Sequence, residues 1–183
     1  MQKFIKELQI DSKSTLIITP NELLEKILGE VIEFYTNKKN LSTILISLNK
    51  PYKKIEEFLS IKGINKDLVF VVDCITRNGE MKSGQNVHYV DPSDLTKIGI
   101  VIRQLMNNIT GKKALIIDEL KAFSFYNELD YVVKFIRSIV GQAQKFDTNV
   151  CMITTEDKEL TDTIVGIFDN INRMDVYQYI KQL

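Results

Sequence analysis

The sequence alternates short apolar runs with longer stretches whose apolar residues recur at helical spacing. The clearest run is residues 114–117, four consecutive apolar residues that follow Gly111 and two lysines and end in Asp118 and Glu119. A short apolar run bounded by turn signals is typical of a strand buried on both faces of a parallel sheet. Comparable runs predict strands at residues 15–19, 42–48, 68–73 and 150–154, and residues 87–90 predict a short edge strand.

Helical patterns separate these runs. Apolar stripes predict helices at residues 20–35, 51–63, 91–111, 127–143 and 157–168. At the first of them Thr19 is expected to be the N-cap, Pro20 suits the first helical position, and Glu22 lies three residues after Thr19. Strands that alternate with helices of this length predict right-handed crossovers and a mainly parallel sheet between two layers of helices.

One domain accounts for the whole chain of 183 residues, a length sufficient for a single sizeable core. Residues 1–13 are predicted to form a lead-in segment, with Phe4, Ile5 and Leu8 among its packing residues. Residues 171–183 are predicted to be an edge strand or tail, and residues 171–179 have the pattern of one or two such strands. Asn78-Gly79 and Ser83-Gly84 predict turns.

Composition excludes several classes of protein. Lys+Arg and Asp+Glu both number 24, so the chain has no net charge to attract nucleic acid or an anionic membrane. Cys74 and Cys151 are too few for a disulfide framework and point to a reducing compartment, and a single histidine argues against a zinc site. No apolar run approaches the roughly 20 residues that span a bilayer. We therefore expect a cytoplasmic protein without a metal or cofactor.

Polar residues gather where the predicted strands end. In an open parallel sheet, ligands bind beyond the carboxyl ends of the strands, so this edge is the predicted location of any site. The candidate rim residues are Thr19, Asn49, Lys50, Asp73, Asp118, Glu119 and Thr155. Acids in such positions also cap helices or bind loop amides, so a structural role is the alternative, first for Asp73 and Glu156 and less so for the consecutive pair Asp118 and Glu119. Cys74 and His88 lack the spacing of a catalytic pair, and Asp73 next to Cys74 is expected to raise the pKa of its thiol.

Between residues 15 and 175 this order of elements resembles the RecA-like ATPases, and most closely the KaiC-like group that is common in archaea. By this resemblance residues 15–24 correspond to the phosphate-loop strand and helix, and residues 44–51 to the second strand. Residues 115–119 correspond to the Walker B strand, in which Asp118 would hold magnesium and Glu119 would activate water. Residues 150–156 correspond to the strand that follows.

The sequence departs from that family at the two places that carry its chemistry. A phosphate loop has the form Gly-x-x-x-x-Gly-Lys-Ser/Thr, but only Thr19-Pro20-Asn21-Glu22 separates Ile18 from Leu23. Pro20 has no N–H for a phosphate, and the Glu22 carboxylate would compete with phosphate for the helix terminus. Asn49-Lys50 stands where the resemblance implies two glutamates that orient the attacking water. Because phosphoryl transfer depends on positioning and charge stabilisation, we expect a degenerate member of the family without catalytic activity.

Three hypotheses follow for what such a protein does. The first is a regulatory or scaffolding module that binds a protein partner or a second copy of itself. Phe123, Phe125 and Tyr126 are its candidate contacts, because aromatic residues often anchor interfaces; packing within the fold is the alternative role for these three residues. The second is a sensor that binds a nucleotide or another small ligand without hydrolysis. The third is a nucleic-acid-binding accessory protein, which the neutral charge disfavours.

Overall fold

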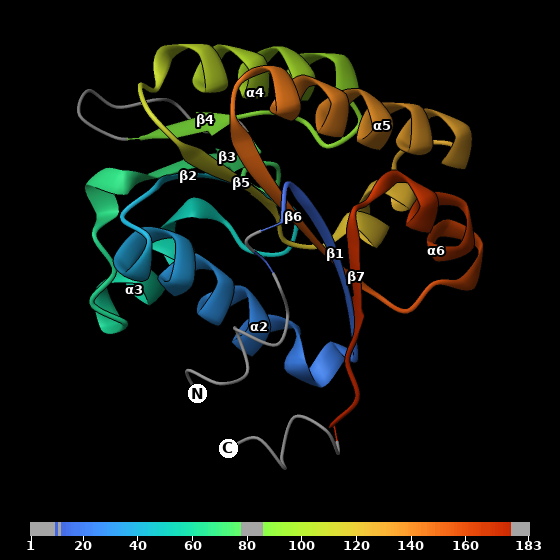
Figure 1. Cartoon of the computed structure of the whole chain (residues 1–183), viewed down its shortest axis with the longest axis horizontal. Coiled ribbons are helices and arrows are strands. Elements are labelled where there is room, and N and C mark those ends of the chain that lie inside the picture. Colours follow the sequence, from blue (N-terminus) through green and yellow to red (C-terminus); the bar gives the residue numbers. More distant parts are fainter. Residues whose placement is uncertain (1–9, 11, 78–85, 177–183) are drawn as a thin grey trace.

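The computed structural model describes residue 10 and residues 12–77 and 86–176. Its centre is one sheet of seven parallel strands in the order β4-β3-β2-β5-β6-β1-β7 (Figure 1). The strands are β1 (Ser14–Thr19), β2 (Ser42–Ser47), β3 (Val69–Asp73), β4 (Val87–Tyr89), β5 (Lys113–Ile117), β6 (Thr148–Thr155) and β7 (Asn170–Arg173). The predicted three-layer α/β fold with a parallel sheet is confirmed.

Helices cover both faces of the sheet. They are α2 (Asn21–Glu33), α3 (Tyr52–Ile61), α4 (Leu95–Asn108), α5 (Leu129–Lys145) and α6 (Lys158–Ile164). The short helical segments are η1 (Phe34–Lys38), η2 (Lys66–Leu68), η3 (Leu120–Phe125) and η4 (Val165–Ile167). In Figure 1, α2 and α3 lie below the sheet, and α4 and α5 lie above it.

Successive residues of the central strands feed two separate cores. In β1, Leu16 and Ile18 pack with α4, α5 and α6, whereas Ile17 packs with α2 and α3. Strand side chains alternate between the two faces of a sheet, so a strand covered on both faces must be apolar throughout. This is the physical reason that the strands appear in the sequence as continuous apolar runs.

Two helix starts differ from the sequence prediction. Thr19 does not cap α2: Pro20 occupies the N-cap position without a side-chain hydrogen bond, and the Thr19 hydroxyl lies 3.3 Å from the Pro20 carbonyl. At α4 the cap is Asp94, whose carboxylate accepts the backbone N–H of Lys97 at 2.8 Å. A capping side chain belongs to the residue directly before the first helical residue; for α2 that residue is Pro20, one position after Thr19.

The remaining boundaries agree with the prediction to within a few residues. Helix α5 begins at Leu129 rather than at Asn127, because residues 120–125 form η3, which the sequence pattern did not predict. Gly63, with a φ of 62°, follows α3 as expected. The predicted lead-in residues Phe4, Ile5 and Leu8, the turns at residues 78–79 and 83–84, and the tail from residue 177 lie outside the described residues.

Candidate functional site

All the strands are parallel, so their carboxyl ends lie along one edge of the sheet, which we call the rim. The order β2-β5-β6-β1 places the ends of these four strands next to one another. Thr19 and Thr155 are direct partners in the register of β1 and β6. The rim therefore brings together most of the polar residues that the sequence marked, and hydrogen bonds link several of them.

Asp118 is fully buried and holds the end of the neighbouring strand. Its carboxylate accepts the backbone N–H of Leu48 at 2.7 Å and that of Asn49 at 3.3 Å, and it lies 2.8 Å from the Ser47 hydroxyl. Burial raises the pKa of Asp118 to about 6, although these three hydrogen bonds oppose the increase. Both oxygens of the Asp118 carboxylate thus accept donors from the end of β2 and from the loop that follows it.

Glu119 makes an equivalent connection on the other side. Its Oε1 accepts the backbone N–H of Thr155 at 3.1 Å and that of Lys121 at 3.2 Å, and the Thr154 hydroxyl lies 3.2 Å away. Only 8% of the Glu119 surface is exposed. The side chain therefore caps η3 and ties β5 to the end of β6.

Asp73 is the third carboxylate with a structural role. It accepts the backbone N–H groups of Tyr52 at 2.7 Å, Ile75 at 2.8 Å and Thr76 at 2.9 Å, and the Thr76 hydroxyl at 2.6 Å. Tyr52 is the first residue of α3, whose N-cap, Pro51, makes no side-chain cap. Asp73 thus caps a helix that lies far from it in the sequence, and the structural alternative describes all three acids.

The connection between β1 and α2 is very short. The strand ends at Thr19 and the helix begins at Asn21, which leaves Pro20 as the only residue between them. A phosphate loop of the usual kind spans eight residues and wraps its ligand with backbone N–H groups. A connection of one proline offers no such wrap, and Glu22 lies in the first turn of the helix.

Asn49 and Lys50 complete the predicted rim. Asn49 is exposed, and its backbone N–H is the group that binds Asp118. The Lys50 ammonium pairs with Glu25 of α2 at 2.6 Å. The lysine therefore links the rim to the lower helical layer.

No protein-family model matches the sequence, and no curated protein matches it. Among solved structures, the chain is similar to a KaiC-like protein from the hyperthermophilic archaeon Pyrococcus horikoshii OT3, with a TM-score of 0.63 and 10% sequence identity. The match covers 87% of this chain and 69% of that protein. The chain has a KaiC-like RecA fold. At this identity the likeness establishes the fold alone, and the activity of the relative is not transferred with it.

On this KaiC-like fold the three candidate contact aromatics are separated. Phe123 is fully buried and packs edge to face against Phe135 of α5, with 5.4 Å between ring centroids, so the prediction that it contacts a partner is wrong. Phe125 and Tyr126 are 74% and 51% exposed. Because η3 is a tight turn of helix, neighbouring residues point in different directions, and only part of the aromatic run reaches the surface.

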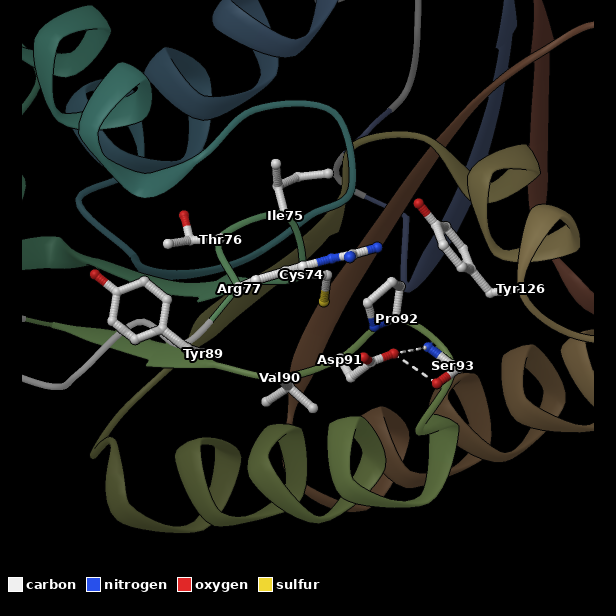
Figure 2. Close-up of a pocket in the computed structure, with 10 residues that line it drawn as sticks. All are labelled: Cys74, Ile75, Thr76, Arg77, Tyr89, Val90, Asp91, Pro92, Ser93 and Tyr126. Carbon is white, nitrogen blue, oxygen red and sulfur yellow. Dashed lines mark hydrogen bonds between the residues drawn. The ribbon is translucent and has the colours of Figure 1, made fainter.

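A cleft of about 780 Å³ lies beyond the ends of β3 and β4, and the sequence prediction missed it. It is lined by Cys74, Ile75, Thr76, Arg77, Tyr89, Val90, Asp91, Pro92, Ser93 and Tyr126 (Figure 2). The signal available in the sequence was the polar stretch after residue 73, but nothing in its spacing links that stretch to Tyr126. The cleft brings the loop after β3 together with Tyr126, which directly follows η3.

Neither cysteine is a candidate nucleophile. Both are buried, free thiols. Burial, followed by the charges of Asp118, Asp73 and Asp91, raises the pKa of the Cys74 thiol, as predicted for the effect of Asp73. Burial also lowers the pKa of His88.

The described part of the chain has neither a metal-binding cluster nor a membrane-spanning helix. Residues 10, 12–77 and 86–176 contain no group of three or more His, Cys, Asp or Glu side chains placed to hold a metal ion. Within the same ranges, no helix combines the length and apolar character needed to cross a membrane.

Proposed function

We propose that this chain is a non-catalytic KaiC-like domain that works through protein contacts, as a regulatory or scaffolding subunit. The observation that carries the proposal is the bonding of the two acids at the end of β5. Asp118 accepts the backbone N–H groups of Leu48 and Asn49, which follow β2, and Glu119 accepts that of Thr155 in β6. This bonding supports a structural role for both acids.

The β1–α2 connection supports the same proposal independently. Nucleotide binding by this fold class uses backbone N–H groups at the start of the first helix, and Pro20 has none to offer. The resemblance further implies acids at the end of the second strand, where Asn49 and Lys50 stand. A domain that lacks both would not position a triphosphate for attack.

The contact part of the proposal depends on Phe125 and Tyr126. Two exposed aromatic residues side by side in the chain are a feature of interface anchors, and they are 74% and 51% exposed here. The partner is either a second copy of this chain or another protein, which we take to be cytoplasmic as predicted from the sequence. Nothing in the charge balance, 24 basic against 24 acidic residues, favours nucleic acid instead.

Phosphate release from ATP tests the catalytic half of the proposal. The purified chain is incubated with ATP and Mg²⁺, and titration calorimetry with ATP and ADP is run alongside. We expect no turnover above the buffer blank and no measurable binding. Turnover that disappears in Glu119→Gln would overturn the proposal, because this isosteric change removes the charge while leaving an oxygen to accept the same N–H groups.

Light scattering and chemical cross-linking test the contact half. If the chain associates with itself, Phe125→Ala together with Tyr126→Ala should shift the assembly to monomers, whereas Ile61→Ala should not. Ile61 is a matched control because it is 83% exposed and lies on α3, in the opposite helical layer. A strict monomer whose cellular partners are retained by the double variant would contradict the contact role of these residues.

A further inference from the structure

The cleft beyond β3 and β4 adjoins the carboxylates of the rim but is not lined by them. Its walls come from three segments: the loop Cys74–Arg77, the connection Tyr89–Ser93 that leads to α4, and Tyr126 at the end of η3. Asp73, Asp118 and Glu119 do not line it. At about 780 Å³ the cleft falls within the range of small-molecule sites.

Two opposite charges face this cleft. Arg77 is exposed and makes no hydrogen bond or ion pair with any residue that the structure describes. The Asp91 carboxylate accepts the backbone N–H and the hydroxyl of Ser93, at 2.8 Å and 2.5 Å. These hydrogen bonds, with a smaller contribution from the charge of Arg77, lower the pKa of Asp91. Arg77 and Asp91 are close enough to interact but do not form a direct ion pair.

The rest of the lining is apolar or aromatic. Tyr89 and Tyr126 stand on opposite sides, with Arg77 extending between them (Figure 2). Cys74 and Val90 are buried and contribute apolar surface between the tyrosines. Tyrosine rings offer flat faces that stack on other rings and attract cations.

We propose that this cleft binds a small zwitterion of the amino-acid class with an aromatic or large apolar side chain. The carboxylate would bind the Arg77 guanidinium, whose fork of donors matches two oxygens. The ammonium would bind the Asp91 carboxylate, and the side chain would lie against Tyr126 or Tyr89. An anion alone would be repelled by Asp91, and a cation alone by Arg77, so a ligand with both charges fits best. The proposal is independent of whether the domain hydrolyses ATP.

Saturation-transfer NMR and titration calorimetry on the full chain test this with matched probes. L-phenylalanine and L-tyrosine carry both charges, 3-phenylpropionate lacks the ammonium, and phenethylamine lacks the carboxylate. We expect an amino acid to bind, and each analogue that lacks one charge to bind at least about tenfold more weakly, since a hydrogen bond to a charged group contributes roughly that factor. Equal binding of the analogues, or no binding of any aromatic amino acid at about 10 mM, would overturn the proposal.

Three variants assign the contacts. Arg77→Gln and Asp91→Asn each remove one charge, and the asparagine retains an oxygen for the Ser93 N–H. Both should weaken amino-acid binding by about tenfold or more. Arg103→Gln is the control, because Arg103 is an exposed arginine on α4 that lines a different groove, between α4 and α5. Binding that is unchanged in Arg77→Gln, or equally reduced in Arg103→Gln, would place the amino acid elsewhere and contradict the assignment.

Discussion

The carboxylate of Asp118, at the end of β5, accepts the backbone N–H of Leu48, at the end of β2, at 2.7 Å. This contact ties the end of β5 to the chain that leaves the adjacent strand β2. Glu119 joins β5 to β6 in the same way, and Asp73 joins β3 to the start of α3. Three buried carboxylates therefore stabilise the rim by linking its strand ends to neighbouring segments.

The buried Asp118 predicts an unusual pH dependence of stability. Its pKa in the folded protein, about 6, is higher than the model-peptide value of 3.8, so the folded state binds this proton more tightly than the unfolded state does. The resulting stabilisation is complete below pH 4 and is lost as the pH rises through 6, by up to about 3 kcal/mol. Asp118→Asn should remove this component, as measured by urea denaturation at pH 4, 5, 6 and 7. If the free energy of unfolding changed with pH in the same way for both proteins, the raised pKa of Asp118 would be contradicted.

Asp73 is predicted to be a strong contributor to stability. Asp73→Ala leaves the backbone N–H groups of Tyr52, Ile75 and Thr76 without their acceptor. Tyr52 is half-buried and Ile75 and Thr76 are exposed, so water replaces part of the lost bonding. We expect a loss of about 1–3 kcal/mol in urea denaturation. Asp67→Ala is the control, because Asp67 is exposed and its loss should change stability by no more than about 0.5 kcal/mol. Equal effects of the two substitutions would refute the role of Asp73.

Substitutions of two phenylalanines in η3 are predicted to have very different effects on the free energy of unfolding. Phe123 is fully buried against Phe135, so Phe123→Ala should reduce the free energy of unfolding by about 3–5 kcal/mol. Phe125 is 74% exposed, so Phe125→Ala should change it by about 0.5 kcal/mol or less. Thermal and urea unfolding of both variants check this. A large loss in Phe125→Ala would mean that this side chain is covered in solution.

Alanine substitutions at two glycines are predicted to change the stability of the protein in opposite directions. Gly63 has a φ of 62°, in the left-handed region that residues other than glycine avoid. Gly63→Ala should therefore destabilise the protein by about 1 kcal/mol. Gly141 lies within α5, and a Cβ there would meet nothing within 4 Å. Gly141→Ala should therefore stabilise the protein by up to about 1 kcal/mol. Differential scanning calorimetry distinguishes the two, and a shared sign would contradict the argument.

The layered fold was predictable from the chain because its pattern is local. Continuous apolar runs such as residues 114–117 specify strands covered on both faces, and the stripe from Leu23 to Tyr35 specifies a helix that covers one of those faces. The short β4 and β7 edge strands were also predicted, since they too are marked by local pattern and turns. Helix capping was predicted less well, because Thr19 makes no cap and Asp73 caps a helix from another strand.

The acids at the rim show what sequence alone determined. The sequence pattern placed Asp73, Asp118 and Glu119 at strand ends. The absence of a phosphate-loop motif between Ile18 and Leu23 was also visible from the sequence. Only the tertiary structure decided which donors those acids accept, that Phe123 is buried while Phe125 is exposed, and that Tyr126 lines a cleft together with Arg77. Periodicity reports which side of an element is apolar. Which elements become neighbours depends on strand order and crossovers, and therefore on contacts between residues far apart in the chain.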